Sequence, residues 1–148
     1  MSQAQQYVIF KLEGESYGIP IEYVKTIEKM TEMTRVPNAP EYVEGVINLR
    51  GEVVPIINMR KRFNLPASDS AEEARTIIME MEEVSVGMIV DSSSEVLSIE
   101  DSAIDQTISL DAAVQDEHIR GIGKIDERMI ILLNLYKVLQ LEDSENQG

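Results

Sequence analysis

The chain has 148 residues, of which 43% are hydrophobic and 27% charged, and its formal net charge at pH 7 is −14. This composition indicates a soluble globular protein of one ordinary domain or two very small ones. The strong negative charge argues against nucleic acid and anionic lipid surfaces as partners. The absence of cysteine excludes disulfides and thiol catalysis and suits the cytoplasm. No apolar run approaches the roughly 20 residues that insert into and span a membrane.

Short strands are predicted one after another from the start of the chain. Apolar, partly β-branched residues at 7–12 predict a first strand, EGES at 13–16 predicts a turn, and SYGIPI at 16–21 predicts the return strand. A third strand is predicted at 24–30. A proline-punctuated connection follows and leads to the next hairpin.

The segment GVINLRGEVVPIIN, residues 45–58, predicts a second hairpin with strands at 45–49 and 53–57. Gly51 supplies the positive φ that such tight turns often need. Because Pro55 cannot donate a backbone hydrogen bond, we expect its N–H side to lie at a sheet edge. Asn58 is a predicted N-cap for a short helix, in which Met59 and Phe63 have helical spacing.

The second part of the chain repeats this pattern. Residues 7–31 align with 76–100, and residues 45–63 align with 121–139, without gaps. The alignment pairs glycines, an asparagine and apolar residues, as in Gly18 with Gly87, Gly45 with Gly121, Asn58 with Asn134 and Val53 with Met129. We therefore expect an all-β fold of two barrel-like sheets with about five strands each and short helices. Small domains bury little core, so we expect the halves to share an apolar junction.

The repeat suggests where the halves begin and end. We place the first barrel at residues 13–66 and the second at residues 67–141, with a polar linker at 65–74 and a long acidic loop before His118. The last helix is expected to continue to about Leu141, followed by an acidic tail at 142–148.

The chain offers little material for catalysis. His118 is the single histidine, and we interpret it as a loop residue. Its neighbours Asp116 and Glu117 are adjacent in sequence and do not converge readily on one metal ion. We expect no enzymatic activity, no metal and no cofactor. A small carboxylate-dependent hydrolase is the alternative from another class.

Basic residues gather at one place in this acidic chain. Arg50, Arg60, Lys61 and Arg62 lie close together in sequence, whereas no lysine or arginine lies between Thr76 and Ile119. The second hairpin reads KIDERM where the first reads NLRGEV, so the architecture does not require Arg-Gly at the tip. Arg50 is therefore available for recognition, although an ordinary exposed turn arginine is the simpler interpretation.

The order of the segments YGIPIEYVKTIE, GVINLRGEVVPIIN, VDSSSEVL and GIGKIDERMIILLN resembles the CheW family of bacterial chemotaxis coupling proteins, over about residues 5–141. The resemblance implies two SH3-like five-stranded barrels on a shared apolar junction. It also allows the strand at 5–12 to complete the second barrel rather than the first.

The resemblance further implies a non-catalytic adaptor between transmembrane chemoreceptors and the histidine kinase CheA. The expected partners are the regulatory domain of CheA and the cytoplasmic tip of methyl-accepting chemoreceptors. The expected location is the cytoplasm, at membrane-bound receptor arrays. An isolated CheW-like regulatory domain of the kinase is the alternative.

The resemblance also implies a set of partner-binding residues and leaves open which of them contact kinase and which contact receptor. They are Val24, Ile27, Gly45, Asn48, Leu49, Arg50, Gly51 and Val96.

Overall fold

The computed structural model describes residues 3–66, 72–105 and 118–139. Its strands in chain order are β1 (Ala4–Leu12), β2 (Glu15–Pro20), β3 (Val24–Lys29), β4 (Val43–Leu49), β5 (Glu52–Asn58), β6 (Arg75–Met81), β7 (Val84–Val90), β8 (Ser92–Glu100), β9 (Ile104–Asp105), β10 (Ile119–Ile125) and β11 (Arg128–Leu133). The helices are short: η1 (Ile21–Tyr23), α1 (Met59–Arg62), η2 (Asp101–Ala103) and α2 (Leu135–Val138). The predicted all-β class is confirmed.

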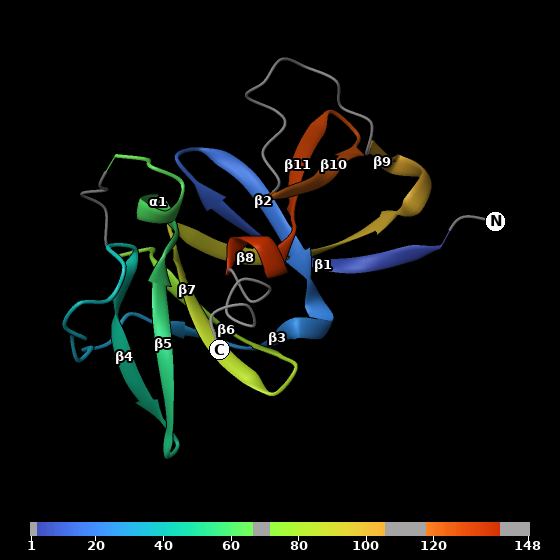
Figure 1. Cartoon of the computed structure of the whole chain (residues 1–148). Coiled ribbons are helices and arrows are strands. Elements are labelled where there is room, and N and C mark those ends of the chain that lie inside the picture. The colour runs from blue at the N-terminus through green and yellow to red at the C-terminus, as the bar shows by residue number, and fades with distance from the viewer. Residues whose placement is uncertain (1–2, 67–71, 106–117, 140–148) are drawn as a thin grey trace. The chain divides into compact units, whose positions relative to one another are not determined.

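The strands form two sheets, and each sheet takes strands from both repeats (Figure 1). The six-stranded sheet has the order β8-β1-β2-β11-β10-β9, and the five-stranded sheet has the order β3-β6-β7-β5-β4. The first hairpin of each repeat, β1–β2 or β6–β7, therefore joins the later strands of the other repeat. The sheets do not follow the boundary that we placed between residues 66 and 67, and β1 lies in the same sheet as β10 and β11.

Each exchange is made by a parallel strand pair with a glycine at the contact. Gly18 of β2 lies opposite Leu132 of β11, and Gly87 of β7 lies opposite Ile56 of β5. A Cβ atom at Gly87 would lie 2.6 Å from the Ile56 Cδ1 atom, and one at Gly18 would lie 3.1 Å from a Leu132 methyl group. The two paired glycines of the repeat thus leave room for apolar side chains of the neighbouring strand.

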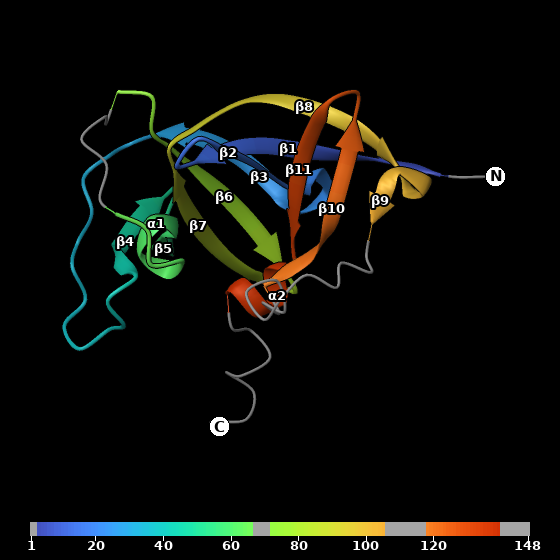
Figure 2. The same cartoon turned by 90° about the horizontal axis from the view of Figure 1, so that it is seen from above.

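The chain divides into two compact units, each with its own core. One unit consists of residues 10–14 and 22–94 and contains the five-stranded sheet, whose buried cluster is Ile47, Val54, Ile56 and Ile78. The other consists of residues 1–9, 15–21 and 95–148, and its buried cluster is Tyr7, Ile9, Ile99, Ile130 and Leu132. Figure 2 shows β1 beside β8, and β10 beside β11, in the sheet that holds the second cluster.

The predicted N-caps are confirmed in both repeats. The Asn58 side chain accepts a hydrogen bond from the Lys61 backbone N–H at 3.2 Å, and Asn134 accepts one from the Lys137 N–H at 3.4 Å. An asparagine at this position satisfies a backbone donor of the first turn. α2 ends at Val138. Leu139 is its C-cap, so the helix ends before the expected Leu141. The tail at 142–148, linker residues 67–71 and loop residues 106–117 lie outside the described residues.

The sheet edge expected at Pro55 is not observed. β5 is an interior strand between β7 and β4. Its parallel register with β7 begins at Ile56, one residue after the proline. Pro55 lies opposite Val46 of β4 and precedes the ladder with β7, so its missing N–H lies outside the parallel pairing.

Candidate functional site

The β4–β5 hairpin projects Arg50 at its tip. Leu49 lies opposite Glu52, so Arg50 and Gly51 alone form the turn. Their φ values are 54° and 89°, the left-handed conformation of tight hairpin turns. The Asn48 side chain accepts a hydrogen bond from the Gly51 N–H at 2.8 Å. Asn48 and Gly51 therefore shape the tip, and the Arg50 side chain is left exposed.

The other basic residues near this hairpin have partners within the same unit. Arg60 forms an ion pair with Asp91, with 2.5 Å between Nη2 and Oδ2. Lys61 Nζ lies 2.8 Å from Glu44 Oε1, and the Arg62 guanidinium lies 5.0 Å from the centre of the Tyr42 ring. These contacts fix three of the four clustered cations to the fold.

Two carboxyl groups respond to these contacts. The hydrogen bond from Arg60 lowers the pKa of the Asp91 carboxyl, and partial burial opposes that change. The hydrogen bond from Lys61 lowers the pKa of the Glu44 carboxyl in the same way. Within the described residues, Arg50 is the member of the basic cluster whose side chain makes neither an ion pair nor a hydrogen bond. Its guanidinium is free to pair with an external carboxylate.

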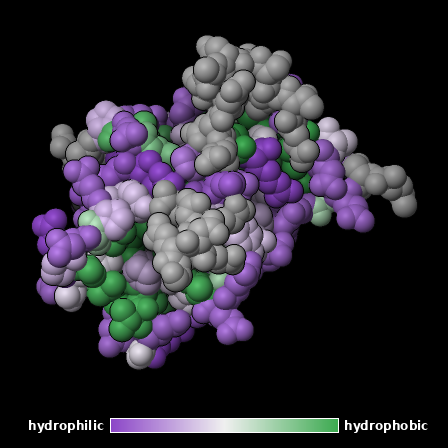
Figure 3. All heavy atoms as spheres, viewed as in Figure 1, coloured by the Kyte–Doolittle hydropathy of each residue, from purple (hydrophilic) through white to green (hydrophobic). Residues whose placement is uncertain are grey.

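Apolar surface lies next to this arginine. Val53 follows the turn and is 66% exposed, and it lies opposite the exposed Asn48. Figure 3 shows hydrophobic residues gathered over the β4–β5 hairpin. Sequence reasoning missed Val53, although its place after the turn and opposite Asn48 could have indicated it. Arginine is enriched at protein interfaces, so an unpaired arginine beside exposed apolar surface makes this hairpin a candidate protein-docking surface.

The structure separates the predicted site residues into different roles. Leu49 is half-buried and packs against the core cluster of its unit. Gly45 is buried, and a Cβ atom there would lie 2.5 Å from the Thr34 carbonyl oxygen, where residue 34 pairs with Val46. Both residues support the hairpin rather than present a contact surface.

The remaining predicted residues lie on other strands. Val24 and Ile27 are on β3, where Val24 is half-buried and Ile27 is 40% exposed. β3 approaches the hairpin through the ion pair between Lys25 and Glu52, at 3.6 Å. Val96 is 46% exposed on β8 and belongs to the other unit.

The β10–β11 hairpin is a second candidate surface. Ile125 lies opposite Arg128, so Asp126 and Glu127 form its turn. Arg128 makes two hydrogen bonds to Glu95, at 2.8 and 3.2 Å, and Met129 is 60% exposed. This confirms that Asp126-Glu127 occupies the same architectural position as Arg50-Gly51.

The two hairpins carry opposite charges at equivalent positions. The repeat aligns Arg50 with Asp126 and Glu52 with Arg128. The aligned apolar residues, Val53 and Met129, are both exposed. We assigned no site residue to the second hairpin from the sequence, although the repeat alignment carried the signal.

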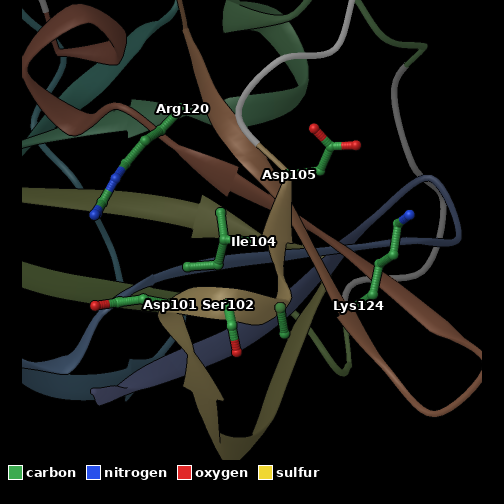
Figure 4. A pocket seen from close by; sticks show the side chains of 7 residues that line it. Asp101, Ser102, Ile104, Asp105, Arg120 and Lys124 are labelled. Atoms are coloured by element: carbon green, nitrogen blue, oxygen red, sulfur yellow. The ribbon is translucent and has the colours of Figure 1, made fainter. Parts of the chain in front are cut away.

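A hollow of about 770 Å³ lies beside β9 and β10 in the six-stranded-sheet unit. Its lining includes Asp101, Asp105, Arg120 and Lys124 (Figure 4). Arg120 and Lys124 extend in different directions in this view, so they do not converge on one ligand. Opposite charges line the same hollow, which gives no preference for an anion or a cation.

No group of three or more His, Asp or Glu residues in the described ranges could hold a metal ion. His118 is half-buried, and its carbonyl oxygen accepts a hydrogen bond from the Asn134 N–H at 2.8 Å. Asp116 and Glu117 lie outside the described residues. In the part of the chain that the structure describes, no helix has the length and apolar character needed to cross a membrane.

The fold and these surfaces define an all-β scaffold whose candidate sites are exposed hairpins. Comparison with known proteins is consistent with that class. The CheW-like domain profile matches residues 6–143. The chain is 36% identical over 142 residues to the chemotaxis protein CheW of Bacillus subtilis, covering 96% of this chain and 91% of that protein. It is 35% identical over 139 residues to CheW of Klebsiella aerogenes, covering 94% and 84% of the two chains.

A solved structure gives the same result. The scaffolding protein TtCheW from Thermoanaerobacter tengcongensis matches with a TM-score of 0.81 and 33% identity, over 92% of each chain. The chain belongs to the CheW family. The resemblance stated from the sequence is thereby confirmed.

Proposed function

We propose that this chain is a chemotaxis adaptor that couples chemoreceptors to the histidine kinase CheA. Family membership supports this role, since the matched relatives are chemotaxis proteins. More specifically, the chain binds the regulatory domain of CheA and the cytoplasmic tip of the receptors. It does so in cytoplasmic arrays beneath the membrane. The isolated kinase domain has less support, because the chain matches CheW proteins over 91% and 84% of their length.

The observation that carries the site assignment is the unpaired Arg50. Its three neighbouring cations have internal partners, whereas Arg50 is exposed at a tip that Asn48 and Gly51 shape. An arginine can form a bidentate pair with a partner carboxylate while its stem packs on apolar surface such as Val53. The docking site therefore combines a charged tip with an apolar patch.

The experiment replaces Arg50 with Asp and checks that the melting temperature is unchanged. Binding to the CheA regulatory domain and to a receptor cytoplasmic fragment is measured separately, together with receptor-stimulated autophosphorylation of the kinase. Loss of a desolvated pair costs about 2–5 kcal/mol, whereas loss of a rim contact costs little. We expect impaired stimulation and weaker binding of at least one partner.

Lys11→Asp is the matched control, because Lys11 is exposed on β1 and the substitution changes the charge by the same amount. It should leave binding and stimulation intact. Full binding and full stimulation by Arg50→Asp would remove Arg50 from the site. Failure of the wild-type chain to bind either partner would overturn the adaptor proposal itself.

A further inference from the structure

The methionines of this chain differ sharply in exposure. The chain has no cysteine and eight methionines, so methionine thioethers are its only sulfur-containing side-chain groups. Met129 is 60% exposed. Met30 is 40% exposed, but its sulfur accepts a hydrogen bond from the Thr76 hydroxyl at 3.5 Å. Four others are 0–1% exposed: Met59, Met79, Met81 and Met88.

We propose that Met129 is an oxidation site for hydrogen peroxide and related two-electron oxidants. The thioether sulfur attacks one peroxide oxygen, the O–O bond breaks, an S–O bond forms and water leaves. The product is methionine sulfoxide, which methionine sulfoxide reductases convert back to the thioether. Susceptibility follows exposure, so the sulfur on the β10–β11 hairpin reacts before the buried ones.

The modification changes one hairpin and spares the other. The repeat aligns Met129 with Val53, which is 66% exposed and has no oxidisable atom. The sulfoxide replaces an apolar side chain by a polar one beside the Asp126-Glu127 turn. This consequence rests on the proposed function, in which the exposed hairpins dock partner proteins. Oxidation of Met129 then weakens docking at the β10–β11 hairpin.

The first test follows sulfoxide formation by peptide mass spectrometry after addition of hydrogen peroxide to the folded full-length chain. We expect Met129 to react about tenfold or more faster than Met79 and Met88, because buried sulfur reacts only after local opening. In denaturant the rates should converge. Equal rates at Met129 and the buried methionines in the folded chain would overturn the modification site, whatever the protein binds.

The second test uses the two aligned positions as matched controls. Met129→Val should remove the fast site, and Val53→Met should create a new one on the other hairpin. Wild-type protein oxidised at Met129 should bind the kinase domain or the receptor fragment at least about fivefold more weakly, since an apolar contact becomes polar.

Treatment with methionine sulfoxide reductase should restore that binding, and Met129→Val should be insensitive to peroxide. Unchanged binding of both partners by the Met129 sulfoxide would overturn the docking consequence. Equal loss of binding in peroxide-treated Met129→Val would assign the effect to another residue.

Discussion

The guanidinium of Arg60 and the carboxylate of Asp91 form a two-point ion pair. Nε lies 2.7 Å from Oδ1, and Nη2 lies 2.5 Å from Oδ2. Asp91 Oδ2 also accepts a hydrogen bond from the Glu13 N–H at 2.9 Å. One carboxylate thus joins α1, the β1–β2 turn and the junction between β7 and β8, which are distant in sequence and belong to one unit.

We expect Asp91→Asn to lower the free energy of unfolding by about 1–3 kcal/mol at neutral pH, because the largely buried Arg60 guanidinium loses its two-point partner and keeps only the Glu13 carboxylate, 3.4 Å away. Arg60 lowers the pKa of the folded Asp91 carboxyl. The pair therefore stabilises the fold above the usual carboxyl pKa of about 3.9, and this contribution disappears as the pH falls through the lowered value. Denaturant unfolding from neutral to acid pH should show the two proteins converging.

Glu95→Gln provides the control for that prediction. Glu95 also makes two hydrogen bonds to an arginine, but the side chains of Arg128 and Glu95 are 40% and 38% exposed. Exposed ion pairs contribute about 0–1 kcal/mol. A loss at Glu95 as large as that at Asp91 would show that burial does not set the strength of these pairs.

The β6–β7 turn offers a stabilising substitution. Glu82 and Glu83 form this turn with φ values of 50° and 71°, whereas the equivalent turn of the first repeat has Gly14 at φ 80°. A non-glycine residue in this conformation costs roughly 1–2 kcal/mol. Glu83→Gly should therefore raise the free energy of unfolding by about 1 kcal/mol.

Two further variants separate backbone strain from charge at these turns. Glu83→Ala removes the charge but keeps the strained backbone, so it should gain less than Glu83→Gly. Gly14→Ala should be destabilising, although no atom lies within 4 Å of a Cβ placed there. Denaturant midpoints measure all three, and an equal gain from Glu83→Ala and Glu83→Gly would contradict the role of φ.

At the β4–β5 tip, Gly51→Val should cost about 1–3 kcal/mol, because a β-branched residue is strained at φ 89°. Arg50→Ala should stay within about 0.5 kcal/mol, because the Arg50 side chain is exposed and unpaired. Thermal and denaturant unfolding of both variants measure the difference. Similar losses would mean that the Arg50 side chain supports the turn.

Exchange of hairpins between the sheets predicts how fragments behave. Residues 1–66 lack β6 and β7 of the five-stranded sheet, and residues 67–148 lack β1 and β2 of the other. We expect neither fragment to melt cooperatively, and we expect an equimolar mixture to regain the circular dichroism of the whole chain. Residues 22–94 contain every strand of the five-stranded sheet and should melt cooperatively with reduced stability. Cooperative melting of both halves at the temperature of the whole chain would contradict this.

Local features of the fold could be predicted from the sequence. The Gly51 turn depends on residues adjacent in the chain, and the Asn58 cap on residues within one helical turn. Strand partners depend on contacts between distant segments, and an apolar strand such as β6 suits either sheet equally well by its own sequence. The exchange of whole hairpins was therefore not predicted from the residues, and only the family resemblance allowed the strand at 5–12 to join the second barrel.

The candidate site was predicted in part for the same reason. Arg50 could be selected because two aligned hairpins differ at that position. The burial of Gly45 depends on Thr34 in a separate segment, which no local pattern indicates. Met129 was overlooked because the residue type alone does not show whether a methionine is exposed or in the core. Only the strand register distinguishes the two cases.

The parallel contact between β2 and β11 sets an order of events during synthesis. The strands of the five-stranded sheet lie within residues 22–94, so the ribosome delivers them as one uninterrupted stretch. β1 and β2 are translated before every other described strand, yet β11, the neighbour of β2, is translated after all the other described strands. The earliest hairpin of the nascent chain must therefore wait, with apolar residues such as Ile9 uncovered, until translation passes Leu133.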